Sequence, residues 1–277
     1  MQRAGEHPIS AGPLAPRWRA YDLGRPRAGA LGRARLRVEN AGTATWRSRG
    51  REGVQLAYHW LDPLGNPIVW DGIRTALPRP VAPGETLELE VPVLAPRPPG
   101  RYRLAFDLVE EHRFWFAEIG CAPLDVAVEV APRIDERRLA VLVHGGSGEE
   151  TDAALRAQQE RPVTVEEAAA VAHLVAGAVP APDWSRRLLD AHAEGWAAVG
   201  GALDVAERRL RARLRAWAPG GGRNPAFGRP LLLPSLLPGL EPTEHEGLPA
   251  HEGDDDDALF DGRIVVRLRP RSGRPRG

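Results

Sequence analysis

Residues 139–152 read LAVLVHGGSGEETD: an apolar run, a glycine-rich turn and an acidic stretch in succession. An uninterrupted apolar run is typical of a parallel strand that is buried on both faces of its sheet. Acidic residues directly after the turn are typical of a helix N-terminus, where they complement the helix dipole. The order strand, turn, helix predicts the opening unit of an α/β domain.

The same alternation of elements continues toward the C-terminus. We expect strands at 170–175 and 197–203 around a helix at 185–194. Proline, glycine, leucine and acidic residues predominate beyond Arg223, so this part is expected to be irregular until a final strand at 263–268. The basic tail, residues 269–277, is expected to be disordered.

The N-terminal half has a different period. From Arg33 onward apolar and polar residues alternate, which is typical of half-buried strands. About seven short strands separated by Pro/Gly turns predict an antiparallel β-sandwich of immunoglobulin-like type. We expect them at 33–39, 54–60, 68–77, 86–94, 101–109, 113–119 and 124–130. Residues 1–30 are rich in Pro, Gly, Arg and Ala and are expected to be poorly structured.

Several turn motifs of this half occur in a family-specific order. The stretch VENAGTATW at 38–46 is followed by VAPGE at 81–85, and then by APRPPGRY at 95–102. Together they resemble bacterial Ig-like modules that are related to the Ig-like domain of autophagy cargo receptors. The resemblance covers residues 30–131 and implies a sandwich. The expected layout is therefore a segment 1–30, a sandwich 31–132, a linker 133–138 and an α/β domain 139–268.

A second resemblance lies in the α/β domain. The loop PAPDW at 180–184, the helix after it and the stretch VGG at 199–201 resemble a nucleotide-sugar glycosyltransferase of the GT-A type, family 2. The resemblance covers residues 139–262, which is short for this fold, so it implies a reduced GT-A-like domain. The fold class expected for the chain is thus multidomain β plus α/β. Within the resemblance, Asp183 and Trp184 are candidate ligand-binding residues.

The metal-binding Asp-x-Asp of that family is missing here. The alignment of the loop places AGA, residues 176–178, where the acidic pair belongs, and Ala176 and Ala178 cannot ligate a metal. We therefore predict no cofactor; Mg²⁺ or Mn²⁺ is expected only if the chain is an active transferase. Replacement ligands would have to come from the acidic and histidine residues at 244–257, with these candidates: Glu244, His245, Glu246, His251 and Asp254.

Other chemistry-bearing residues have simpler structural interpretations. The glycine turn at 145–148 matches neither the Walker spacing nor the dinucleotide fingerprint, so we expect an ordinary strand-to-helix turn. Ser147 lies outside any Gly-x-Ser-x-Gly elbow. His192 is expected to be a satisfied histidine on an amphipathic helix. Glu194 and Asp204 are the nearest candidates for a general base.

Aromatic residues suggest a binding face on the sandwich. Alternation within 113–119 places Phe114 and Phe116 on one face of a strand and Trp115 on the other, so one set faces away from the core. Trp70 lies beside Asp71 and Arg74 in the sequence. Because exposed tryptophans stack on sugar rings, we predict a ligand-binding patch made of Trp70, Arg74 and Trp115.

Composition limits the functions that are compatible with the chain. The 37 basic residues, all arginine, balance 37 acidic residues, so we expect no nucleic-acid partner. No apolar run is long enough for a membrane span, and residues 1–27 lack the apolar core of a signal peptide. Cys121 is the only cysteine, which fits a reducing compartment and predicts a cytoplasmic location.

Three functions remain open at this stage. The first, which we expect, is a glycosyltransferase-like accessory or non-catalytic binding protein of surface-polysaccharide or glycan biosynthesis. The second is an active metal-dependent glycosyltransferase with a nucleotide-sugar donor. The third is a protein-interaction module built on the Ig-like sandwich. The corresponding partners are a glycan, a nucleotide sugar or another protein.

Overall fold

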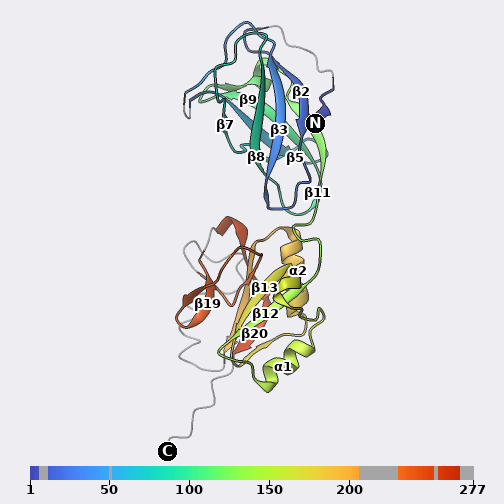
Figure 1. The fold of residues 1–277 in the computed structure, drawn as a ribbon, viewed down its shortest axis with the longest axis vertical. Coiled ribbons are helices and arrows are strands. Elements are labelled where there is room, and N and C mark those ends of the chain that lie inside the picture. The colour runs from blue at the N-terminus through green and yellow to red at the C-terminus, as the bar shows by residue number, and fades with distance from the viewer. Residues whose placement is uncertain (6–11, 50–51, 206–229, 253–254, 269–277) are drawn as a thin grey trace, which may run out of the picture. The chain divides into compact units, whose positions relative to one another are not determined.

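The computed structural model describes residues 1–5, 12–49, 52–205, 230–252 and 255–268 (Figure 1). The chain divides into two compact units, Met1–Ala131 and Pro132–Gly277. Strands dominate the described residues of both units, and those of the second unit also form two α-helices. The expected β-rich multidomain fold is therefore confirmed at this level.

The first sheet of the first unit includes a strand that composition did not predict. Its order is β1 (Gln2–Arg3), β2 (Pro16–Asp22), β3 (Leu31–Asn40) and β8 (Thr86–Leu94), and all neighbours are antiparallel. The expectation that residues 1–30 are poorly structured is wrong for β2, because its Trp18 side chain is buried in the core.

The second sheet is built around two long antiparallel strands, β5 (Glu52–Leu61) and β9 (Gly100–Glu110). Five shorter partners flank them: β4 (Ser48–Arg49), β6 (Pro67–Val69), β7 (Thr75–Ala76), β10 (Phe114–Trp115) and β11 (Leu124–Val130). Two expected strands are interrupted. The stretch 68–77 contributes only the ends that form β6 and β7, and the stretch 113–119 becomes β10 followed by a 3₁₀ turn, Phe116–Ile119.

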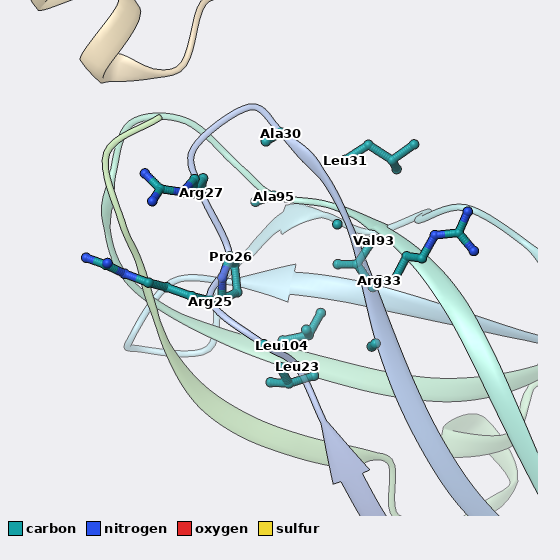
Figure 2. Close-up of a pocket in the computed structure, with 13 residues that line it drawn as sticks. Leu23, Arg25, Pro26, Arg27, Ala30, Leu31, Arg33, Val93, Ala95 and Leu104 are labelled. Carbon is teal, nitrogen blue, oxygen red and sulfur yellow. The ribbon is translucent and has the colours of Figure 1, made fainter. Parts of the chain in front are cut away.

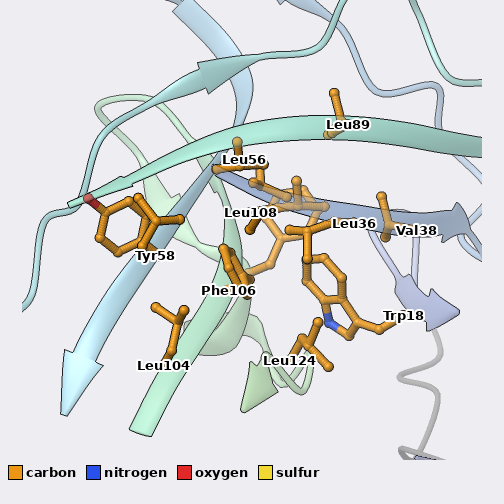
Figure 3. Close-up of a cluster of buried hydrophobic side chains, with 14 of the residues drawn as sticks. Trp18, Leu36, Val38, Leu56, Tyr58, Leu89, Leu104, Phe106, Leu108 and Leu124 are labelled. Carbon is orange, nitrogen blue, oxygen red and sulfur yellow. The ribbon is translucent and has the colours of Figure 1, made fainter. Parts of the chain in front are cut away.

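One apolar core fills the space between these two sheets (Figure 3). Alternation along β5 directs Leu56, Tyr58 and Trp60 inward, where they meet Leu36 of β3 and Phe106 of β9. The indole nitrogen of Trp60 donates to the carbonyl oxygen of Leu94 at 2.9 Å, so this buried polar atom is satisfied. With one face of the second sheet committed to the core, its opposite face is free to carry other chemistry.

The second unit contains a six-stranded mixed sheet in the order β12, β13, β17, β15, β20, β14. The pairs β12–β13 and β15–β20 are parallel and the others are antiparallel. The strands have these bounds: β12 (Leu139–His144), β13 (Ala170–Val175), β14 (Ala178–Pro180), β15 (Ala198–Val205), β17 (Ser235–Leu236) and β20 (Ala258–Leu268).

Two features of this unit differ from expectation. The run at 139–143 is not buried on both faces, since Leu142 is 40% exposed. The segment expected to be irregular contains β17, a long β20 and a separate three-stranded sheet with these members: β16 (Leu231–Leu232), β18 (Thr243–His245) and β19 (Leu248–His251). The tail 269–277 lies outside the described residues.

The helices among the described residues of this unit are α1 (Glu149–Arg156) and α2 (Trp184–Glu194), close to the predicted positions. Both contribute to one core with the mixed sheet, through Leu155 of α1 and through Trp184 and Leu188 of α2. Among the residues that the structure describes, no helix combines the length and the apolar character needed to cross a bilayer.

Candidate functional site

The outer face of the second sheet, opposite the core, carries a buried cluster. Alternation on β5 and β9 directs Ala57, His59, Ala105, Asp107 and Val109 to this face. The register sets His59 opposite Ala105 and Ala57 opposite Asp107. Because the alanine side chains are small, they leave room above the sheet for large rings.

Three rings occupy that space. His59 stacks on Trp70 with ring centroids 4.2 Å apart, and the centroids of the His59 and Trp115 rings are 4.4 Å apart with their planes inclined at 63°. The rings of Trp70 and Trp115 are 6.3 Å apart and nearly perpendicular, which is a favourable aromatic geometry. Trp115 is only 9% exposed, whereas Trp70 remains 51% exposed. We call these three residues with Arg74 the aromatic platform.

Arg74 holds the edge of the platform in place. Its guanidinium carbon lies 4.7 Å from the centre of the Trp115 ring, within range of a cation–π interaction. Its Nε is 2.5 Å from Glu111, and a terminal nitrogen is 2.6 Å from Asp71. The Glu111 side chain is largely buried, but that of Asp71 is 70% exposed. The platform therefore presents a flat ring next to an exposed carboxylate.

The loop that carries Trp70 and Arg74 is fixed to β5 by its backbone. The Gly72 amide donates to the Tyr58 carbonyl oxygen at 3.0 Å. A Cβ at position 72 would lie 2.5 Å from that oxygen, so only glycine allows the loop to lie this close. Nδ1 of His59 donates to the carbonyl oxygen of Trp70, which fixes the loop a second time.

The electrostatics of the cluster follow from its burial. Burial lowers the pKa of His59, so its imidazole is neutral at pH 7. Burial also raises the pKa of Asp107 to about 6, although backbone amides of Ala117 and Leu108 donate to its carboxylate. Glu118 accepts a hydrogen bond from the Trp115 amide at 3.0 Å.

The structure brings together the three residues of the predicted patch, Trp70, Arg74 and Trp115. It also shows that Phe116 faces the core while Trp115 faces outward, as alternation requires. His59 and Glu111 belong to the same cluster and were missed. The available signal was the place of His59 on the outward face of a mostly apolar strand.

Asp183 and Trp184 have structural roles within the second unit. Trp184 is 1% exposed and belongs to the core of the second unit, so a ligand does not reach its ring. Asp183 is the N-cap residue of α2, and its carboxylate pairs with Arg187 at 2.5 Å and Arg186 at 3.7 Å. Both residues start and anchor the helix.

The candidate metal ligands are spread over a hairpin. Glu244 and His245 are successive residues of β18 and point to opposite faces, while His251 ends β19. Glu246 forms the turn at φ 50°, and His245 faces Glu252 at 3.6 Å. Within the described residues, no three His, Cys, Asp or Glu side chains converge on one point; Asp254 lies outside them.

The glycine turn and its neighbours form a structural junction. Gly145 and Gly146 have φ of 83° and 89°, a backbone region that suits glycine. Ser147 donates to Asp152, and the first turn of α1 also carries Glu149 and Glu150. These carboxylates would repel a diphosphate at this helix N-terminus.

The buried histidine of α2 is satisfied on both nitrogens, as predicted. Nδ1 of His192 donates to the Trp196 carbonyl at 2.8 Å, and Nε2 lies 2.9 Å from the Ser235 hydroxyl.

Of the two residues considered as a general base, Asp204 pairs with Arg267 at 3.2 Å and Glu194 ends the helix. A separate pair joins Nε2 of His144 to Nδ1 of His173 at 3.0 Å.

A pocket of about 270 Å³ lies at one end of the first unit (Figure 2). Leu23, Val93 and Leu104 are among its apolar lining residues. The side chains of Arg25 and Arg27 lie on one side and Arg33, which pairs with Glu90, on the other, so the guanidinium groups do not converge. Its volume is below the roughly 300 Å³ at which small-molecule sites begin. The aromatic platform is the stronger candidate.

Comparisons with known proteins add little. No protein-family model and no curated protein matches the chain. Among solved structures, the chain is similar to the C-terminal domain of wzt, with a TM-score of 0.29 and 11% identity over 44% of this chain and 75% of that one. It is also similar to a family 123 glycoside hydrolase from Clostridium perfringens, described for glycolipid glycan hydrolysis, with a TM-score of 0.24 and 8% identity over 65% of this chain and 32% of that one. Both scores are too low to carry an argument.

Proposed function

We propose that this chain is a non-catalytic glycan-binding protein associated with surface-polysaccharide or glycan biosynthesis. In this proposal the first unit is an Ig-like sandwich that holds the sugar. The second is a reduced GT-A-like unit without transferase activity.

One observation carries the proposal: a half-exposed Trp70 ring is held rigidly from beneath by the buried His59. Pyranose rings present a face of C–H groups that packs against a flat aromatic surface, and their hydroxyls hydrogen-bond to planar polar groups at its edge. Asp71 and Arg74 supply such groups. Because the ring is fixed before binding, little conformational entropy is lost when a sugar stacks on it.

The same geometry is less suited to a protein partner. A stable protein interface buries about 800 Å² on each side, usually around several anchors. In the aromatic platform, Trp115 and His59 are already buried and Trp70 is the ring that remains exposed. A single ring with polar groups at its edge matches a sugar unit in size.

The second unit supports a non-catalytic role through its residue chemistry. Ala178 starts β14 and is buried, in the region where the resemblance places the metal-binding aspartates. The carboxylate of Asp183, from the retained PAPDW loop, is paired with arginine. The loop therefore serves as a helix start.

The test is a glycan array of bacterial surface polysaccharides, followed by titration calorimetry on the best ligand. Trp70→Ala removes the stacking surface and is expected to weaken binding at least about tenfold, or ~1.4 kcal/mol. Trp70→Phe keeps an aromatic face and should retain part of the affinity.

Leu64→Ala is the matched control, because Leu64 is an exposed apolar residue of the same unit outside the platform. It should bind like the wild type, and all three variants should unfold cooperatively at temperatures well above that of the binding assay. Equal affinity of Trp70→Ala and wild type would refute the proposal.

A further inference from the structure

The groups around Trp70 point to the class of glycan that the aromatic platform accepts. Asp71 and Glu111 both pair with Arg74, so two carboxylates meet one guanidinium. Glu118 accepts a hydrogen bond from the Trp115 amide and adds a third carboxylate next to the platform. The sum of these charges is negative.

Arg74, the positive group of the platform, makes more contacts within the protein than Asp71 does. Arg74 is held by Asp71, by Glu111, by the Gly72 carbonyl at 3.2 Å and by the Trp115 ring. A sugar carboxylate or phosphate would have to displace these contacts to pair with Arg74. Asp71, in contrast, exposes most of its carboxylate to solvent beside Trp70.

We propose that the aromatic platform selects neutral and amino-bearing glycans and discriminates against acidic ones such as uronic acids. This inference rests on the proposed function and specifies its ligand class. An ammonium or hydroxyl group near Asp71 gains a hydrogen bond to a charged acceptor. A sugar carboxylate at the same place is repelled by Asp71.

The net charge of the whole chain does not produce this selectivity. Its formal net charge is zero, so long-range attraction to either sign of polysaccharide is small. Any discrimination must then come from local groups. It should diminish at about 1 M salt, where the screening length falls to about 3 Å.

The experiment uses three hexamers with one β-1,4-linked backbone: cellohexaose, the chitosan hexamer and the cellouronic acid hexamer. They carry no charge, amino groups and carboxylates respectively. Calorimetry with the full chain at about pH 6, where sugar carboxylates are ionised, gives the three affinities. We expect the chitosan hexamer to bind most tightly and the cellouronic acid hexamer least.

Asp71→Asn keeps the size of the side chain and one accepting oxygen, and it removes the negative charge. The affinity ratio of the chitosan to the cellouronic acid hexamer should fall about five- to tenfold. Glu88→Gln, which removes an exposed carboxylate from the other sheet, should leave the ratio unchanged.

The outcomes separate the two proposals. Tightest binding of the cellouronic acid hexamer, or an unchanged ratio in Asp71→Asn, would overturn the charge selectivity while glycan binding stands. Absence of binding to every hexamer and to the glycan array would overturn both.

Discussion

At the scale of single residues, two glycines fix close approaches that no other residue permits. Gly72 brings the platform loop against β5, and Gly201 brings β15 against β20 in the second unit. A Cβ at position 201 would lie 2.0 Å from the Ile264 carbonyl oxygen. This contact lies where the pairing of β15 with β20 shifts register, between Gly201 and Ala202. The absence of a side chain at Gly201 is what allows the strands to pack this closely at the register shift.

Gly201→Ala should therefore destabilise the second unit, by about 1–3 kcal/mol, because a strand must move away to accommodate the methyl group. Hydrogen exchange read by mass spectrometry should show faster exchange in peptides from β15 and β20, with β5 and β9 unchanged. Gly262→Ala is the control, since its nearest neighbour would be a Phe260 ring atom at 4.0 Å. Equal exchange in both variants would contradict the argument.

At the scale of elements, α2 is joined to the sheet by a buried histidine. His192 connects the end of the helix, through the Trp196 carbonyl, to Ser235 of β17. Burial is the main cause that lowers its pKa to about 4. The neutral imidazole therefore belongs to the folded state, while the unfolded chain takes up a proton near pH 6.5.

The pH dependence has a definite sign. Because the folded pKa lies below the unfolded one, stability is complete above about pH 6.5 and decreases as the pH falls toward 4, by about 3 kcal/mol for His192. His173, whose pKa is also lowered to about 4 by burial and by His144, acts in the same direction. Urea unfolding at several pH values should show this loss.

His192→Gln removes the titrating group and should flatten that dependence, although it is less stable at neutral pH because one side-chain contact is lost. The residual slope then reflects the other groups with shifted pKa values: His173 and His59, whose pKa values are lowered, act in the same direction, and Asp107, whose pKa is raised to about 6, acts in the opposite direction. The control is His112→Asn, a change at an exposed turn residue of the first unit with φ 61°, which asparagine tolerates. An undiminished slope in His192→Gln would show that another group controls acid sensitivity.

Elements also show what the sequence reveals and what it conceals. Strong periodicity predicted β9, β11 and β13 nearly to the residue. Strand β2 was missed because proline, glycine and arginine around it conceal the inward-facing Trp18. The break after Trp115 was missed because Glu118 closes a local turn onto the Trp115 amide.

The candidate site was predictable only in part for the same reason. Trp70 and Arg74 are neighbours in sequence, and alternation gave the outward face of Trp115. His59 enters the cluster through the pairing of β5 with β9, residues more than forty positions apart. Local patterns do not encode such a register.

At the scale of the whole molecule, the two units differ in the groups that they offer for ligand binding. The first carries a fixed aromatic surface with polar groups at its edge. In the second, the position expected for the metal-binding pair is occupied by alanines, and no three metal-binding side chains converge within the described residues. If binding resides in the first unit, a sugar chain and a nucleotide sugar should affect the protein differently.

Thermal unfolding with UDP-, GDP- and dTDP-sugars, with and without Mn²⁺, tests this difference. A ligand that binds only the folded state raises the melting temperature according to its concentration and affinity. We expect no shift with any nucleotide sugar, with or without Mn²⁺, because Ala176 and Ala178 cannot hold the metal that bridges the diphosphate. The glycan identified on the array should raise the temperature in the same buffer, and Trp70→Ala should abolish that rise. A rise of several degrees that requires both Mn²⁺ and a nucleotide sugar would instead support an active transferase, and would direct the search for its ligands to residues 244–257.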